Sequence, residues 1–466
     1  MNYHHHVLPL ASFLLFAAPL GAVTETELVA EDGALLDRLG QAIAADGNLV
    51  VAGSTGDDDA GSRSGSAYLF DATTGVQLHK LTAPDAASGD EFGTSIDVSG
   101  NYIAVGVPDD DDAGFGSGSV WIFTIDQLDN PDYEPLKLTA NDAASGDAFG
   151  NAVALDGNQV LVGAWKDGED QGAAYLFDVT TGQQLQKYIA NDAAPFDQFG
   201  GAVALSAGRV AIGAAFSDSP EADAGAVYLF GTSSSSQLGK LVAPDGTTGD
   251  TFGESLAMHD GKLLVGASNF DSNDEDIEVG HGRAYLFDVD SGELLLTLSD
   301  PAGEPGARFG VAVALGSRIV VGSDFASSSL FNSIGAVVSF ELTGNFKSRL
   351  QRSHPQSGDF LGASVGLAGS LIVAGVPQAD TQGSQSGSVI LFDDASLAEI
   401  PPLQLTRSGQ DNILSWAASP GMVYQLQYST DLVDWHPLSQ NLTEDNYTDV
   451  DALTDPTKFY QLTIGQ

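Results

Sequence analysis

The residues best suited to chemistry in this 466-residue chain are acidic side chains spaced so that a loop could bind a hard cation. Asp271, Asn273 and Glu275 place oxygen atoms at positions i, i+2 and i+4, and Glu278 follows near the place of a closing carboxylate. Ca²⁺ prefers oxygen ligands in this arrangement. We therefore predict a calcium site in this loop, and two further pairs could serve in the same way: Asp109 with Asp111, and Asp57 with Asp59.

A second interpretation of the same acids follows from the net charge of −46, which comes from 63 acidic and 17 basic residues. Most carboxylates on such a surface are solvated and keep the protein soluble. The charge also repels nucleic acids and anionic membranes, so we expect the chain to bind neither.

Catalytic residues are not indicated. The histidines after residue 22 are scattered, with neither metal-ligand spacing nor a nucleophile beside them: His79, His259, His281, His354 and His436. Cysteine is absent from the sequence, which excludes both a thiol nucleophile and disulfides. The chain is therefore predicted not to be an enzyme.

The elements that would position these acids belong to a unit that occurs seven times, and each copy has three anchors. The first anchor is Phe-Gly or Leu-Gly, as at Phe92-Gly93. A β-branched run ending in glycine follows, as at Gly106. The third anchor is a glycine with phenylalanine five residues later, as at Gly118 and Phe123.

Between the anchors lie short runs rich in β-branched and aromatic residues, bounded by turn-forming residues, which predict four strands per repeat. The inner runs are apolar at successive positions, so both faces of these strands must be covered. The sequence thus predicts an all-β fold, a seven-bladed β-propeller, with a β-solenoid as the rival. The segment Thr26–Ala30 matches a fourth strand with no strands before it, so we expect it to complete the last blade.

Phe92-Gly93 followed by Val105-Gly106-Val107-Pro108 resembles the FG-GAP repeat of integrin α-subunit heads and of many secreted bacterial proteins. The resemblance implies an extracellular propeller for binding or adhesion, often supported by calcium. Calcium-holding repeats of that kind have an Asp-rich loop between the first two strands. Here that connection is a tight turn, such as Asp46-Gly47, so those family sites do not carry over.

In such a blade the connections alternate between the two faces of the disc. The long acidic loops between second and third strands would therefore share a face with the loops between blades, and we predict that this face is functional. The inter-blade loops also carry aspartates five residues apart, such as Asp85 and Asp90. Their repetition indicates turns that are fixed by side-chain hydrogen bonds rather than ligand sites.

The ends of the chain predict two further segments. Residues 1–22 contain an apolar stretch and a small-residue end, as in a signal peptide, so the protein is predicted to be secreted or held at the cell surface, with no membrane insertion after cleavage. Residues 23–400 would form the propeller. Residues 403–466 are expected to form a small β-sandwich, since Val423–Ser429 with Leu432 and Trp435 resembles fibronectin type III-like modules.

These observations favour a monomeric binding or adhesion protein whose partner is an extracellular protein or a glycan, with Ca²⁺ as a possible cofactor. Two alternatives remain open: a structural envelope protein without a discrete ligand, and a propeller-type polysaccharide lyase or hydrolase with its site at the axial mouth.

Overall fold

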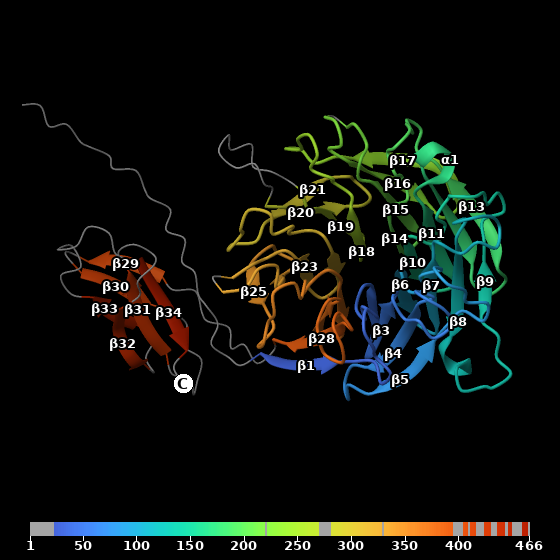
Figure 1. Ribbon diagram of the computed structural model, residues 1–466. Helices are drawn as coiled ribbons and strands as arrows, with labels where there is room; N and C mark the ends of the chain where they lie inside the picture. The colour runs from blue at the N-terminus through green and yellow to red at the C-terminus, as the bar shows by residue number, and fades with distance from the viewer. Residues whose placement is uncertain are drawn as a thin grey trace, which may run out of the picture. The chain divides into compact units, whose positions relative to one another are not determined.

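The computed structural model describes residues 23–219, 221–269, 281–328 and 330–394, together with strands between 404 and 464. Residues Glu25–Asp393 form one compact unit, and the strands after Asp394 belong to another. In the first unit, seven four-stranded antiparallel sheets are arranged as blades in a ring (Figure 1). The predicted seven-bladed propeller is confirmed.

The strands of each blade follow one another in sequence, except in blade 7, which takes its fourth strand from the start of the chain. Blade 1 comprises β2 (Ile43–Asp46), β3 (Leu49–Ser54), β4 (Ser66–Asp71) and β5 (Gln77–Leu81), and blade 2 comprises β6 (Ser95–Ser99), β7 (Tyr102–Val107), β8 (Ser119–Thr124) and β9 (Leu136–Leu138). Blade 3 comprises β10 (Val153–Asp156), β11 (Gln159–Ala164), β12 (Ala173–Asp178) and β13 (Gln183–Tyr188), and blade 4 comprises β14 (Ala202–Ser206), β15 (Arg209–Ala214), β16 (Ala226–Gly231) and β17 (Ser234–Leu241). Blade 5 comprises β18 (Ser255–His259), β19 (Lys262–Ala267), β20 (Arg283–Asp288) and β21 (Leu294–Leu298), and blade 6 comprises β22 (Val313–Leu315), β23 (Ile319–Ser323), β24 (Ala336–Phe340) and β25 (Phe346–Leu350). Blade 7 comprises β26 (Val365–Ala368), β27 (Leu371–Val376), β28 (Ser388–Asp393) and β1 (Thr24–Leu28).

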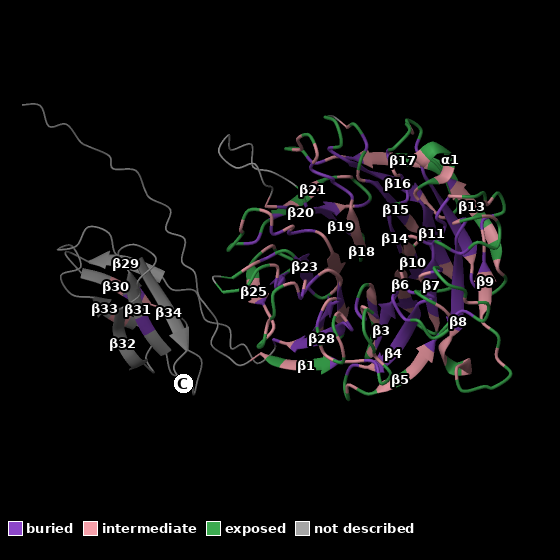
Figure 2. Ribbon diagram, viewed as in Figure 1, coloured by how far each residue is buried: buried purple, intermediate pink, exposed green. Residues whose placement is uncertain are grey.

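The second and third strands of each blade are almost wholly buried, as the continuous apolar runs predict (Figure 2). In blade 1, for example, Val50, Val51, Tyr68 and Phe70 have no or almost no exposed surface. Neighbouring blades supply the cover, because core clusters join side chains of adjacent sheets. The outer strand β5 is only partly buried.

The three sequence anchors meet where one blade joins the next. Gly65 of blade 1 pairs with Phe92 of blade 2 in a parallel bridge. A Cβ on Gly53 would lie 2.1 Å from the carbonyl oxygen of Gly93, so only glycine allows the two backbones to approach this closely. Within blade 2, the anchor rings of Phe92 and Phe123 pack edge to face at 6.1 Å. The repeated motif is therefore the junction between blades.

The ring closes through β1, which pairs with β28 of blade 7 (Figure 1). Leu39 also bridges to Gly387, so blade 7 joins blade 1 by the same junction as the other blades. The predicted closure by the N-terminal strand is confirmed.

The loops follow the predicted division between two faces. A two-residue turn joins the first and second strands of blade 1, where Asp46 pairs with Leu49. On the opposite face, the loop between second and third strands bonds to the loop that leads into the next blade: Gly89 N–H donates to the Ser62 carbonyl and Glu91 N–H to the Arg63 carbonyl. We call this side the loop face.

In the part of the chain that the structure describes, the helical segments are the short α1 (Asp167–Asp170) and the 3-10 helix η1 (Ile125–Gln127). Among the described residues, neither these nor any other helical segment has the length and apolarity of a membrane span.

The second unit contains two three-stranded sheets, in the orders β29-β30-β33 and β32-β31-β34. Their strands are β29 (Gln404–Ser408), β30 (Asp411–Ser415), β31 (Tyr424–Ser429), β32 (His436–Leu442), β33 (Asn446–Asp449) and β34 (Phe459–Ile464). An all-β module is therefore present, and its fibronectin type III-like sandwich packing stays a prediction. The predicted signal peptide lies outside the described residues.

Candidate functional site

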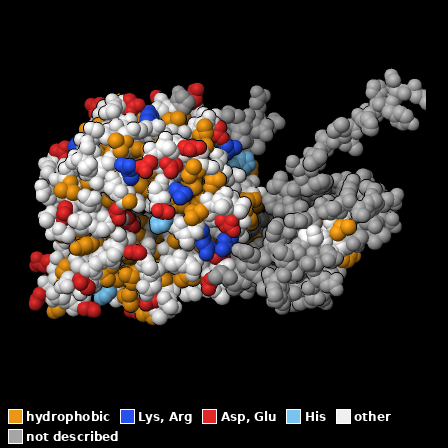
Figure 3. All heavy atoms as spheres, turned by 180° about the vertical axis from the view of Figure 1, so that it is seen from behind, with side chains coloured by type: hydrophobic (Ala, Val, Ile, Leu, Met, Phe, Trp, Pro, Cys, Tyr) orange, Lys and Arg blue, Asp and Glu red, His pale blue; other side chains and the backbone are white. Residues whose placement is uncertain are grey.

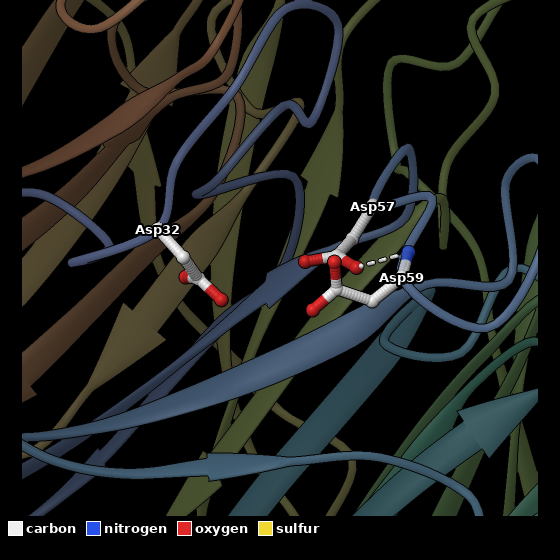
Figure 4. Close-up of side chains that lie close together, drawn as sticks. All are labelled: Asp32, Asp57 and Asp59. Atoms are coloured by element: carbon white, nitrogen blue, oxygen red, sulfur yellow. Dashed lines mark hydrogen bonds between the residues drawn. The ribbon is translucent and has the colours of Figure 1, made fainter.

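The acids of the loop face in blade 1 surround a lysine. Lys80 Nζ, on β5, lies 2.7 Å from Asp32 Oδ2, 2.8 Å from Asp57 Oδ2 and 2.6 Å from Asp59 Oδ2. Asp32 comes from the loop before the blade, whereas Asp57 and Asp59 come from the loop after β3, and the three carboxylates face one another (Figure 4). The Tyr68 hydroxyl lies 2.8 Å from Asp57 Oδ2. Five side chains from four segments, two loops and the strands β4 and β5, thus form one network of ion pairs and hydrogen bonds.

The same lysine cluster recurs around the ring. In blade 2, Lys137 Nζ lies 2.6 Å from Asp85, 2.7 Å from Asp110 and 2.5 Å from Asp112. In blades 3 to 5 the first inter-blade aspartate pairs with a basic side chain of the same blade: Lys187 with Asp142, Lys240 with Asp192, and Arg283 with Asp245. Blade 6 has Ala302 at that position, and Arg349 pairs instead with Asp300, two residues earlier.

Hydrogen bonds in these clusters favour the charged forms of Lys80 and Asp110. Burial alone would lower the pKa of Lys80, but its hydrogen bonds to the three aspartates outweigh burial and raise the pKa above its usual value. Burial would raise the pKa of Asp110, but hydrogen bonds from Lys137 and Ser119 hold it below its usual value. The contacts therefore favour the charged forms of Lys80 and Asp110.

Blade 7 forms this contact with its charges reversed. Its outer strand is β1, where Glu27 occupies the place of Lys80, and the basic partner, Arg352, comes from the loop before the blade. Arg352 lies 2.8 Å from Glu27 and 3.0 Å from Asp359. The two ends of the propeller sequence are thus joined by an ion pair as well as by β1.

The predicted metal ligands differ in whether the structure brings them together. The carboxylates of Asp57 and Asp59 do come together, with Asp32, within 4.8 Å of one another, but the ammonium of Lys80 lies among them. In blade 2 the corresponding residues are Asp110 and Asp112, not Asp109 and Asp111. Asp109 is exposed, and Asp111 accepts a hydrogen bond from Gly116 N–H. Asp271, Asn273, Glu275 and Glu278 lie outside the described residues.

The aspartates spaced five apart divide into two roles. The first of each pair bonds to the lysine cluster, as Asp85 does. The second accepts a backbone N–H three residues earlier and fixes the turn into the blade, as Asp90 does with Ala87 at 2.7 Å. The interpretation of these second aspartates as architectural agrees with the structure. Blade 6 lacks this turn contact because Ala307 replaces the aspartate.

A second group of charged side chains, which the sequence analysis missed, lies between blades 5 and 6. Arg308 Nη2 is 3.3 Å from Glu254 Oε1, and its Nη1 is 3.2 Å from Asp324 Oδ2. Ser268 donates a hydrogen bond to the other oxygen of Glu254. Asp324 is buried, and its Oδ1 has no hydrogen-bond partner among the described residues. Burial raises the pKa of Asp324 to about 6, although Arg308 opposes the rise.

Two aromatic rings complete this group. Arg308 lies over the Phe325 ring, 5.2 Å from its centroid, and the rings of Phe325 and Phe360 are 5.0 Å apart. Phe325 is 40% exposed. We call Glu254, Ser268, Arg308, Asp324, Phe325 and Phe360 the blade 5/6 cluster. It sits where β18 begins and β23 ends, at the loop-face end of the inner strands.

Superposition of the repeats could have found this cluster. At the position of Asp324, two residues after the second anchor glycine, the other blades carry Thr55, Pro108, Trp165, Ala215, Ser268 and Pro377. Asp97 on β6 is a similar exception, because the other inner strands have alanine or glycine there. Its carboxylate accepts a hydrogen bond from Leu155 N–H of blade 3 at 2.6 Å.

The family follows from a match over more than half of the chain. Residues 23–70, 76–123, 134–177, 183–230 and 235–287 match the model described as FG-GAP repeat. The chain belongs to the FG-GAP repeat family. The matched stretches contain blades 1 to 4 and part of blade 5, and the sheet order of this FG-GAP propeller supplies blades 6 and 7.

Other comparisons add little about this FG-GAP propeller. A structure described as the Neurospora crassa Pan2 WD40 domain is similar over 76% of this chain and 89% of that one, with 9% identity and a TM-score of 0.47. At that level the likeness carries no functional argument. No curated protein matches the chain.

Proposed function

We propose that this FG-GAP propeller is a secreted or cell-surface protein that binds or adheres to an extracellular ligand through its loop face. The described loops of this face are held together by many contacts. Lysine clusters and backbone bonds join adjacent loops where the structure describes this face, so binding to those loops would cost little loop ordering. Figure 3 shows acidic, basic and apolar side chains interspersed on one side of the molecule.

The observation that carries the proposal is a set of large apolar side chains at the tips of these fixed loops. Phe115 is 82% exposed and Phe196 is 68% exposed. Leu35, Leu36 and Leu330 are also exposed on loops of the same face. Exposed aromatic and aliphatic side chains on a charged, well-ordered surface are typical of interaction sites. They add nothing to the core of the propeller.

The test is binding of the full chain, labelled, to a glycan array and to immobilised extracellular proteins. If the loop face binds the ligand, Phe115→Ala or Phe196→Ala should abolish binding. The matched control is Leu185→Ala, which removes an exposed apolar side chain from the outer strand β13 instead. Silence on both panels would contradict the proposal and favour the structural envelope alternative.

Calcium support is a separate proposal, and it rests on the loop with Asp271, Asn273, Glu275 and Glu278. Lys80 and Lys137 already neutralise the carboxylates of blades 1 and 2. Thermal melts in EDTA, Ca²⁺ and Mg²⁺ should show stabilisation by Ca²⁺ that disappears in a Asp271→Asn, Glu275→Gln variant. A Ca²⁺ shift that survives these substitutions would place the site elsewhere.

One observation favours the enzyme alternative. Glu254 and Asp324 are carboxylates bridged by one guanidinium, and the raised pKa of Asp324 suits a proton donor. Release of reducing ends or unsaturated products from polysaccharides, abolished by Glu254→Gln, would establish catalysis. Absence of turnover with retained binding supports the adhesion function.

A further inference from the structure

The repeats act as internal controls, because whatever the propeller needs for folding appears in several blades. The blade 5/6 cluster fails this criterion. The positions of Glu254, Arg308 and Asp324 carry no such set of charges in any other pair of neighbouring blades. Blade 6 has also lost the two acids that the early blades use for architecture, since Ala307 and Ala326 stand in their places. The acids and the arginine of this cluster are therefore additions to the scaffold.

The cluster is incomplete in its hydrogen bonding. Asp324 is buried, and Arg308 binds only one of its two oxygens, so Oδ1 lacks a donor among the described residues. A buried acceptor left without a donor destabilises the fold, because it has lost its hydrogen bonds to water. Arg308 is partly exposed beside it, with further N–H groups beyond the two that bind carboxylates. The cluster therefore presents donors on Arg308 and acceptors on the partly exposed Glu254, beside the buried and unsatisfied Oδ1 of Asp324.

The charge and the aromatic rings together indicate the class of ligand. Arg308 is already balanced by two carboxylates, which disfavours an anion. A hydroxyl group can donate to a carboxylate and accept from a guanidinium. The 40% exposed ring of Phe325, supported by Phe360, offers an apolar face on which the C–H groups of a sugar ring can pack.

We propose that the blade 5/6 cluster binds a neutral sugar residue of a glycan, with Phe325 beneath the sugar ring and the partly exposed Arg308 and Glu254 on its hydroxyls. This rests on the proposed binding function and specifies its ligand and its place. It differs from the loop tips with Phe115 and Phe196, which belong to blades 2 and 4.

The experiment uses an array of neutral hexose oligosaccharides, followed by calorimetry of the full chain with the best-bound oligosaccharide. Phe325→Ala should weaken binding at least about tenfold, which corresponds to about 1.4 kcal/mol. The matched control is Phe216→Ala, at the same repeat position in blade 4 and also 40% exposed, which should leave affinity within about twofold. Arg308→Lys keeps the charge but loses the bridge between two carboxylates, and should also weaken binding.

Thermal melts of each variant separate lost binding from lost folding. Equal losses in Phe325→Ala and Phe216→Ala, or none in either, would overturn the assignment. Preference for amine-bearing peptides over every neutral oligosaccharide would also overturn it, since the carboxylates would then bind a cation. A ligand whose binding survives Phe325→Ala but not Phe115→Ala would refute the sugar site while leaving the binding function intact. If the wild-type protein binds neither class of ligand, both the sugar site and the binding function are refuted.

Discussion

Blade 2 and blade 6 have the same four strands and the same junctions, but they use charge in opposite ways. In blade 2, Asp85, Asp110 and Asp112 share one lysine that lies within 2.7 Å of each carboxylate. Related clusters recur in neighbouring blades. In blade 6, Asp324 occupies a position where the other blades have no acid, and one of its oxygens is unpartnered among the described residues.

The comparison separates scaffold from additions to it. Recurring charges have their partners within the repeat and make the loops stiff. The charges around Asp324 occur in one place only and leave a buried oxygen unpartnered among the described residues, and a ligand is the simplest reason for the fold to tolerate that cost. In a repeat protein this distinction does not need an alignment of relatives, because each blade is compared with its neighbours.

The largest effect expected from breaking a recurring cluster is that of Lys137→Met. It leaves Asp110, whose side chain is 6% exposed, without its cation, and should destabilise the protein by about 3–5 kcal/mol. Lys240→Met is the matched control, because its partners are Ser219 and the half-exposed Asp192, and about 1 kcal/mol is expected. Urea unfolding followed by circular dichroism compares the two. Equal losses would show that burial of the carboxylate does not matter.

The pH dependence distinguishes the two kinds of acid by sign. Burial raises the pKa of Asp97 to about 7, from 3.8. The native state then holds a proton that the unfolded chain has lost, so this contribution to stability falls as pH rises from about 4 to 7. Its ceiling is about 4 kcal/mol. The melting temperature of Asp97→Asn should therefore change less with pH across this range than that of the wild type. The stability contributed by Asp110 changes with pH in the opposite direction. Because its pKa is lowered in the folded state, this stability is present at neutral pH and is lost only below pH 4. Parallel pH curves for wild type and Asp97→Asn would disprove this assignment.

A smaller effect is expected at the turns. Asp90→Ala removes the acceptor for Ala87 N–H and should cost about 1 kcal/mol, whereas Asp90→Asn keeps an acceptor and should cost much less. Thermal melts of the two variants test this. Similar losses would mean that the charge, not the hydrogen bond, fixes the turn.

The smallest effect is expected at the exposed edge of the same lysine cluster. The Asp112 side chain is 63% exposed, so Asp112→Asn should change the free energy of unfolding by less than about 0.5 kcal/mol even though its oxygen touches Lys137. A loss close to that of Lys137→Met would show that the three carboxylates act as one unit.

Sequence alone predicted the fold well because its determinants recur. The glycines and phenylalanines of the junction appear in every blade or nearly so, and the orphan strand at the start indicated the closure. The lysine clusters were missed because Lys80 reaches Asp57 only through the register of β4 with β5, where Tyr68 lies opposite Lys80. Asp109 and Asp111 were chosen by their spacing rather than by their place in the repeat, which put them one residue out of register. Glu254, Arg308 and Asp324 are far apart in sequence, and only their blade positions bring them together.

The pairing of β1 with β28 has a consequence for the order of events during folding. The strand that begins the propeller needs β28 as its partner, and β28 is the last strand of the propeller to be synthesised. Early blades can assemble against one another as they emerge, since each contacts only its neighbours. Blade 7 and the junction to blade 1 must wait until β28 has been synthesised. Until then, both ends of the growing ring expose unpaired strand edges and uncovered apolar faces, and this interval is when the protein is most exposed to aggregation and proteolysis.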